Sequence, residues 1–238
     1  MFTGIPFSKD KPYNYREAKL ILKQAMAELR SQKLLAKELG ADIFFEGRSA
    51  ITGKQSHTVW DYIPLQSAKE AGAFTSFPHL TLFLNRDHVG IIVSIPNGLK
   101  RSLRRKLIDL GEQEFVDLME IVKDRLVKAL SKSSSGIPVA SVQQRHYRSQ
   151  RSIPVVDARL EYDLRTAFPR EGKSPIKCQP DWLHTTFQTL ANKQSNLHLS
   201  VGAFIPYADG SGLKSAGVIR LTTDVWLACK PLIQKIVR

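Results

Sequence analysis

The sequence predicts an α+β fold in which mixed antiparallel hairpins are flanked by amphipathic helices. Apolar runs of strand length surround a polar turn at residues 85–88, as in a β-hairpin. Residues 15–39 and 115–130 instead repeat their apolar positions at helical spacing. Strands and helices do not alternate as regular βαβ units, so a doubly wound parallel sheet is not expected.

The first half of the chain opens with the clearest element, a helix over residues 15–39. Asn14 is placed to cap this helix, Glu17 stands three residues later as in a capping box, and Gly40 ends it. The other elements expected in this half are a short strand over 42–46, a polar loop over 47–58, hairpin strands over 80–84 and 89–95, and helices over 99–110 and 115–130.

A linker is expected at residues 132–137, which are rich in small polar side chains and are followed by Pro138. This linker would separate an N-terminal α+β lobe of residues 1–131 from a C-terminal α+β lobe of residues 138–238. The second lobe is expected to hold strands over 139–148, 153–164 and 197–205, a helix over 181–192, and a terminal helix from Asp224 that is kinked at Pro231.

Net charge is the strongest global feature of the sequence. Thirty-five Lys and Arg residues against 22 Asp and Glu residues give a net charge of +13. The surplus is present on both sides of Ser135, so it does not belong to a detachable tail. Such a charge attracts phosphate backbones, and nucleic acid is therefore the expected partner. The alternative interpretations are an acidic protein or membrane surface as the partner, and solubility alone.

Several classes of protein are not expected from this composition. No apolar run approaches the roughly 20 residues that a membrane-spanning helix requires, and the N-terminus lacks a secretory signal pattern. A cytoplasmic protein without a membrane partner is therefore expected. Cys178 and Cys229 lie far apart without a Cys-x-x-Cys motif, so neither a disulfide framework nor a zinc site is expected.

The first candidate binding segment is the basic helix that follows Asn97-Gly98. Lys100 and Arg104 are spaced i,i+4, as are Arg101 and Arg105. Like charges at this spacing repel, and a polyanion would relieve the repulsion. The start of the helix would also offer free amide groups to a phosphate. The alternatives are the solvated face of an ordinary amphipathic helix and a nuclear import signal.

The second candidate segment places three arginines around two aromatic rings. Arg145, Arg148 and Arg151 could bind phosphates, while Tyr147 could stack on a base. His146 could act as a general acid beside a bound phosphate. A polar edge strand, whose charges discourage edge pairing, explains the same residues equally well.

The third candidate is a row of carboxylates between residues 155 and 165. Alternation along a strand would place Asp157, Glu161 and Asp163 on one face, where they could hold Mg²⁺ for phosphodiester hydrolysis. Mg²⁺ is expected as a cofactor only under this hypothesis. Arg159 and Arg165 lie between the acids, which favours a solvent-facing charge ladder; a protein interface is a third interpretation.

The fourth candidate is the loop over residues 46–57. Arg48 and Lys54 could contact a phosphate there, but the spacing of a phosphate-binding loop is absent and Gln55 replaces the required hydroxyl. The six histidines of the chain are scattered, and none is paired at metal-ligand spacing on one element. His146 and His57 have the most polar and cationic neighbours and are the first histidines to test.

Three functions follow from these features. The leading hypothesis is a nucleic-acid-binding module, or a subunit of a larger nucleic-acid-processing complex with protein partners. The first alternative is a metal-dependent nuclease or phosphoesterase that uses the Asp157, Glu161 and Asp163 cluster. The second alternative is a scaffold subunit that docks on an acidic protein. Whether the protein is an enzyme is left open by the sequence.

Overall fold

A computed structural model describes eleven stretches of the chain, and the account below refers to these residues. The stretches are 15–45, 51–53, 58–65, 77–85, 87–96, 101–131, 136–146, 155–168, 181–191, 197–207 and 215–237. Within them, only the backbone is described for 15–17, 51–53, 101–104, 145–146, 156 and 215–216.

The described strands form one antiparallel sheet with the order β1-β2-β3-β4-β7-β5-β6. Every pair of neighbouring strands is antiparallel. The α+β class with antiparallel hairpins is thereby confirmed. The strands are β1 (Ile51–Gly53), β2 (Thr58–Pro64), β3 (His79–Leu84), β4 (His88–Ile95), β5 (Ile137–His146), β6 (Val156–Asp163) and β7 (Leu197–Pro206).

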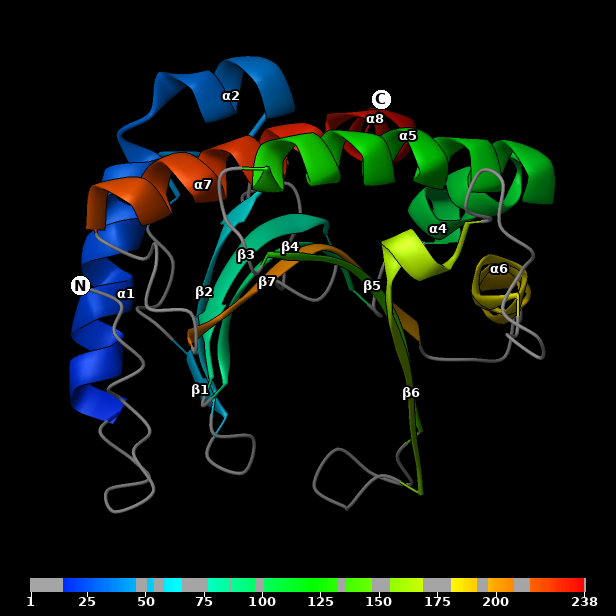
Figure 1. The fold of residues 1–238 in the computed structure, drawn as a ribbon, viewed down its shortest axis with the longest axis horizontal. Coiled ribbons are helices and arrows are strands. Elements are labelled where there is room, and N and C mark those ends of the chain that lie inside the picture. Colours follow the sequence, from blue (N-terminus) through cyan, green and yellow to red (C-terminus); the bar gives the residue numbers. More distant parts are fainter. Residues whose placement is uncertain are drawn as a thin grey trace.

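The sheet arches, and most of the helices lie over its outer, convex side (Figure 1). Helix α1 packs on β2 and β3, α5 on β5, and α7 on β4 and β7. The inner, concave side of the arch faces away from these helices. The helices are α1 (Tyr15–Arg30), α2 (Lys33–Leu39), α4 (Arg101–Ile108), α5 (Glu112–Leu130), α6 (Trp182–Ala191), α7 (Ser215–Ala228) and α8 (Lys230–Val237), with a short 3₁₀ helix η3 (Leu164–Thr166) after β6.

The main core fills the space between the convex face and the helices. Alternate strand residues such as Leu80, Leu82 and Val201 point into it, because successive side chains of a strand face opposite sides of the sheet. Trp226 of α7 is fully buried, and its indole Nε1 donates a hydrogen bond to the Ile92 carbonyl at 3.2 Å. This bond anchors α7 to the middle of the sheet.

The close approach of β4 and β7 depends on a glycine. A Cβ atom at Gly202 would lie 2.1 Å from the Ile91 carbonyl oxygen and 2.7 Å from the Ile92 Cα. Both are backbone atoms, so any larger residue would push the two strands apart. Gly202 therefore allows the backbones of β4 and β7 to lie this close together.

The helix predicted over 15–39 is two helices. The α-helical path ends at Arg30, where the Ser31 hydroxyl donates to the Glu28 carbonyl and Gln32 adopts an extended ψ of 96°. Helix α2 then ends at Gly40, as predicted. Gly40 has a left-handed φ of 70°, and its N–H donates to the Ala36 carbonyl at 3.0 Å.

The predicted strand over 42–46 is wrong. Residues 41–45 form a turn, and Phe44 is 87% exposed, although its apolar neighbours suggested a buried strand. Part of the predicted loop over 47–58 is instead β1, which pairs with β2. The hairpin of β3 and β4 is confirmed, with the Asn85 N–H donating to the His88 carbonyl at its turn.

The C-terminal helix begins earlier than predicted, at Ser215 rather than Asp224. The helical path is interrupted at Cys229, between α7 and α8. Pro231 therefore lies in the first turn of α8 and does not kink a longer helix. Proline is tolerated there because the first-turn amides have no partner within the helix.

The expected linker joins two parts of the chain that contribute to the same sheet. Strand β4 precedes residues 132–137 and pairs with β7, which follows them and pairs with β5. The main core likewise contains residues from both sides. Residues 132–135 lie outside the described stretches. Among the described residues, no helix is both long and apolar enough to span a membrane.

Candidate functional site

Polar side chains cross the concave face of the sheet in one row. The residues of this row are cross-strand partners in β3, β4, β7, β5 and β6, and all lie on the side of the sheet opposite the main core. The polar row is His79, Ser94, Ser200, Ser141 and Glu161. The register of five strands thus gathers residues that are far apart in the sequence.

A pocket of about 380 Å³ opens over this row. Its volume lies within the range of roughly 300–1,000 Å³ that is typical of small-molecule sites. The polar row forms its centre, with Trp60 and Phe83 toward the β2 side and Arg159 toward the β6 side. The pocket therefore offers hydroxyl, imidazole, guanidinium and aromatic groups to one ligand.

His79 is buried in the pocket floor with a defined tautomer. Its side chain is 3% exposed, and its Nδ1 lies 3.1 Å from the Phe77 carbonyl oxygen. A carbonyl oxygen can only accept, so Nδ1 carries the proton and Nε2 of the neutral ring holds a lone pair. Burial lowers the pKa of His79 to about 4, which keeps this ring neutral at pH 7 in the empty pocket.

His198 lies on β7 and reaches the same pocket. It is half-buried and opposite Gln143 of β5. Strand β4 separates β7 from β3, so the backbones that carry His198 and His79 are two strand spacings, or roughly 10 Å, apart. Burial is the main cause of the low pKa of His79. The hydrogen bond with Phe77 opposes it, and the charge of His198 lowers the pKa further. His79 is level with Ser200 through Ser94, so His198 lies two residues, or roughly 7 Å, further along β7, and both histidines line the same pocket.

Each of these histidines is followed two residues later by a hydroxyl on the same face. Thr81 follows His79, and Ser200 follows His198. Both hydroxyl residues are at least nine-tenths buried and line the pocket. The Thr81 hydroxyl lies 2.8 Å from the Ser94 hydroxyl, which orients both groups. The floor is therefore built from paired imidazole and hydroxyl groups.

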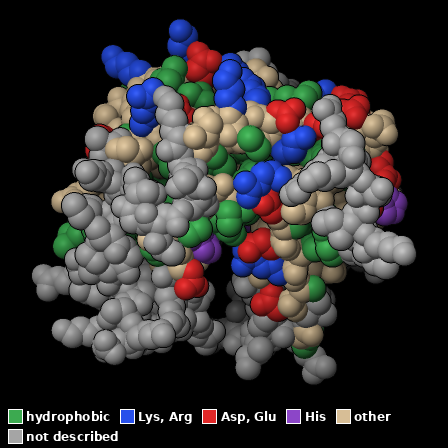
Figure 2. Space-filling view, in the orientation of Figure 1, with side chains coloured by type: hydrophobic (Ala, Val, Ile, Leu, Met, Phe, Trp, Pro, Cys, Tyr) green, Lys and Arg blue, Asp and Glu red, His purple; other side chains and the backbone are tan. Residues whose placement is uncertain are grey.

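The opposite wall of the pocket is β6, where charged side chains alternate. Arg159 forms an ion pair with Glu161, and Gln143 Nε2 donates to Asp157 Oδ1 at 2.8 Å. Acidic and basic side chains follow each other down the strand at the lower right in Figure 2. This pattern corresponds to the charge ladder that the sequence favoured.

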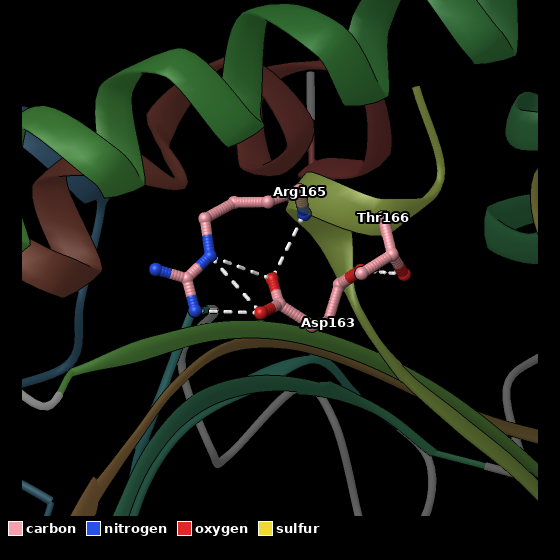
Figure 3. A network of polar contacts seen from close by, with 3 residues as sticks. All are labelled: Asp163, Arg165 and Thr166. Carbon is pink, nitrogen blue, oxygen red and sulfur yellow. Dashed lines mark hydrogen bonds and ion pairs between the residues drawn. The ribbon is translucent and has the colours of Figure 1, made fainter. Parts of the chain in front are cut away.

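Asp163 has its own partners at the end of β6. Its carboxylate accepts hydrogen bonds from the Arg165 backbone N–H at 2.9 Å and from Arg165 Nη2 at 2.6 Å (Figure 3). The Thr166 hydroxyl donates to the Asp163 carbonyl at 2.7 Å, so these contacts cap η3. Among the described residues, no three His, Cys, Asp or Glu side chains are grouped to hold a metal ion. The magnesium site at Asp157, Glu161 and Asp163 gains no support from this arrangement.

The end of the pocket nearest the β3–β4 turn is aromatic. His88 stacks on Phe204 with ring centroids 4.2 Å apart, and Phe83 meets both rings edge-on. Burial lowers the pKa of His88 to about 4. Ile92 and Val139 pack with Phe204 into a small apolar cluster on this side of the sheet. His88 thus packs among apolar side chains at this end of the pocket, and His79 packs against the Tyr62 and Phe77 rings.

Most of the predicted phosphate-binding residues cannot be placed in the site. Those outside the described stretches are Lys100, Tyr147, Arg148, Arg151, Arg48, Lys54 and His57. The backbone alone is described for Arg101 and Arg104 in α4 and for Arg145 and His146 at the end of β5. Arg105 is described, and its Nε lies 3.4 Å from Asp109 Oδ2 in an exposed i,i+4 pair on α4.

The positive surplus belongs mainly to residues whose side chains are not described. Of the 35 Lys and Arg residues 15 have described side chains, and of the 22 Asp and Glu residues 16 do. The described body is therefore close to neutral. A continuous basic track stays a prediction that depends on the remaining side chains.

The pairing of His79 with His198 was missed by the sequence analysis, which treated the histidines as scattered. A signal was present in the tripeptides His79-Leu80-Thr81 and His198-Leu199-Ser200. In a strand, the first and third residues of such a tripeptide face one side and the leucine faces the other. The repeat therefore predicts two similar polar pairs, each opposite a core leucine. Their meeting in one pocket depends on strand order.

Comparisons with known proteins do not assign the chain. No model of a known protein family matches the sequence. A search of curated proteins likewise finds no significant match.

Proposed function

We propose that this protein binds a phosphodiester in the concave pocket and cleaves it with His79 and His198 as a general acid–base pair. The observation that carries this proposal is the convergence of two His-Leu-Thr/Ser tripeptides from β3 and β7 on one pocket. Imidazole groups are the commonest general acids and bases, and their contribution to the rate is typically 10²–10⁴-fold.

The chemistry requires one imidazole to accept a proton and the other to donate one. Nε2 of neutral His79 would remove the proton of an attacking water as its oxygen bonds to phosphorus. Protonated His198 would donate a proton to the ester oxygen as the bond from phosphorus to that oxygen breaks. Both rings return to their starting states when the proton on His79 passes through solvent to His198.

A bound phosphate would also change the pKa of His79, the proposed general base. The pKa of His79 is low in the empty pocket because burial disfavours the imidazolium. An anion beside the ring favours the protonated form and raises this pKa toward neutrality. General-base catalysis is most effective when the pKa is near the working pH. The substrate would thus bring His79 into its useful range.

The hydroxyl and guanidinium groups supply the phosphate contacts in this proposal. Thr81 and Ser200 stand beside the two histidines and can donate to the non-bridging oxygens. Arg159 is half-exposed at the β6 wall and can balance the phosphate charge while it keeps Glu161 as a neighbour. The net charge of +13 favours a nucleic acid or nucleotide as the phosphodiester.

The direct test measures cleavage of a dinucleoside monophosphate and of bis(4-nitrophenyl) phosphate. We expect His79→Gln and His198→Gln each to lower kcat by about 10²–10⁴-fold. His184→Gln is the matched control, because His184 contacts Glu112 between α5 and α6 and does not line the pocket. Cleavage at the wild-type rate by both pocket variants would remove the proposal.

Nucleic-acid binding without catalysis is the second candidate, and the net charge of +13 favours it. Each phosphate that a cation neutralises releases counterions, so affinity should fall steeply between 50 and 200 mM salt. Filter binding of single-stranded RNA and DNA over this range measures the slope. Under this candidate, the His79→Gln variant binds with the wild-type slope and the wild-type protein shows no cleavage. Affinity independent of salt would contradict it.

A further inference from the structure

We propose that Trp60 and Phe83 form a nucleobase-binding subsite in the concave pocket, so that the substrate is a nucleotide whose base stacks at the β2–β3 wall. This inference rests on the proposed function for the position of the phosphate. It adds the class of substrate and the residues that select it.

The two residues lie opposite each other on β2 and β3. Trp60 is the cross-strand partner of Phe83, and both line the pocket. Cross-strand partners have Cβ atoms about 5 Å apart on the same face of a sheet. Both side chains are half-buried, so part of each ring faces the pocket. Large apolar rings that remain partly exposed beside buried polar groups are typical of ligand sites.

Phe83 is held in place from three directions. Its ring lies over Gly90, where an added Cβ would come within 1.9 Å of the Phe83 Cζ. His88 and Phe204 meet the same ring edge-on, with centroids 5.6 and 5.7 Å away. A ring that is already immobilised loses little side-chain entropy when a ligand stacks on it, which favours binding.

Aromatic contacts connect this wall to His79, the proposed general base. The Trp60 ring lies 5.9 Å from the Tyr62 ring, and the Tyr62 ring lies 5.1 Å from His79. A single side chain, that of Tyr62, therefore separates Trp60 of β2 from His79 of β3. A nucleotide with its phosphate at the polar row would extend its sugar and base toward this wall.

The chemistry of the wall suits a base better than another phosphodiester substituent. Nucleobases present flat π-faces that stack on Trp and Phe, and stacking tolerates any base. Asn85 and Thr58 also line this end and offer an amide and a hydroxyl to base edges. The Asn85 side chain is already oriented by contact with His88 at 3.0 Å.

The experiment compares adenosine monophosphate with ribose 5-phosphate, which lacks the base. We expect Trp60→Leu to weaken adenosine monophosphate binding roughly tenfold or more and to leave ribose 5-phosphate binding unchanged. Trp60→Phe keeps a ring and should retain most of the affinity. Isothermal titration calorimetry measures both ligands on all three proteins.

Fluorescence gives a second readout that needs no cleavage. Adenosine monophosphate should quench wild-type emission, and the quenching should vanish in Trp60→Leu. The other two tryptophans are controls within the chain, since Trp226 is fully buried and Trp182 lies against Tyr162 outside the pocket lining. Equal binding of both ligands by the wild type, or unchanged nucleotide binding in Trp60→Leu, would overturn the subsite.

Gly90→Ala tests the same subsite without removing an aromatic ring. The new methyl group would displace the Phe83 ring from its position over β4. We expect weaker binding of adenosine monophosphate and unchanged binding of ribose 5-phosphate, with circular dichroism to check the fold. If His79→Gln abolishes cleavage while these variants bind nucleotide normally, the subsite fails and the proposed function stands. If nucleotide quenches Trp60 but no cleavage occurs, the subsite stands and the proposed function fails.

Discussion

The two faces of the central sheet bury different kinds of side chain, although the same strands supply both. In β3, Leu80 and Leu82 point into the core beneath the helices, while His79 and Thr81 point into the concave pocket. Burial hardly differs, since Leu80 is 0% exposed and His79 is 3% exposed. On the concave face, the Tyr62 and Phe77 rings pack against His79. A stable core does not require buried polar groups, which cost free energy unless they are bonded. Their concentration on one face is the arrangement on which the proposed function rests.

The buried Asp61 on the helix-covered face shows what a structural polar group looks like. Arg30 Nη2 donates to both oxygens of the Asp61 carboxylate at 3.3 Å and to the Tyr62 carbonyl at 3.0 Å. The Tyr62 N–H also donates to Asp61 at 2.7 Å. Burial raises the pKa of the Asp61 carboxyl, and Arg30 opposes this change. Asp61 thus has dedicated partners, whereas the pocket imidazoles face a space that a ligand can fill.

The largest stability effect is expected from breaking that ion pair. Arg30→Met should destabilise the protein by about 3 kcal/mol or more, because it leaves the Asp61 carboxylate buried without its cation. Urea denaturation followed by circular dichroism measures the change. Arg105→Met, which removes an exposed i,i+4 pair, is the control and should cost less than about 0.5 kcal/mol.

A loss of similar size for both variants would contradict the contrast between the buried and exposed pairs. Replacing both members of the buried pair, as Arg30→Met with Asp61→Leu, should recover stability, because no unpaired charge is then left in the core.

The next effect is the pH dependence that His79 contributes. Its pKa is about 4 in the folded protein and near 6.5 in the unfolded chain. The unfolded chain therefore binds the proton first, and stability that is complete above pH 6.5 is lost as the pH falls toward about 4. The loss can reach about 1.4 kcal/mol per pH unit. His79→Gln should flatten the dependence of the free energy of unfolding on pH over this window.

His184 provides the opposite sign as a comparison. Its hydrogen bond to Glu112, and the charge of that residue, raise the pKa of His184. Its contribution is therefore present below pH 6.5 and is lost as the pH rises through the raised pKa. His184→Gln should remove stability only on the acidic side. If His79→Gln and His184→Gln changed the pH profile in the same direction, the contrast between the pocket and the surface would fail.

The smallest effect is expected on β6. Asp157→Asn and Glu161→Gln should each change the free energy of unfolding by less than about 1 kcal/mol, because these carboxylates belong to an exposed ladder. Asp157 does not line the pocket, so Asp157→Asn should also leave phosphodiester cleavage with and without Mg²⁺ within a few-fold of wild type. Loss of a Mg²⁺-dependent activity in Asp157→Asn would instead restore the nuclease hypothesis for this row.

Local patterns made much of the fold predictable. The hairpin of β3 and β4, the helix α5 and the end of α2 at Gly40 were predicted close to their observed bounds because periodicity and turn residues act over short distances. The break at Ser31 was missed because residues 31–39 continue the helical pattern; at the break, the local Ser31–Glu28 hydrogen bond is joined by a tertiary contact of Gln32 with Thr223. The turn at 41–45 resembles a strand in composition alone.

The candidate site, like the fold, was predictable from the sequence only in part. The residue types on β6 and their alternation were evident from the sequence, and so was the basic surplus. The meeting of His79 with His198 was not, because their separation along the chain carries no information about the strand order that brings β3, β4 and β7 together. No short motif encodes a pocket whose members come from six strands.

By itself, the sequence determined the class of the fold, the alternation of polar and apolar side chains, and the net charge, since each depends on composition or on neighbouring residues. Tertiary structure alone decided which polar side chains share a surface. Antiparallel register and strand order place residues from distant parts of the chain on one face of the sheet, so two histidines more than a hundred residues apart line one pocket.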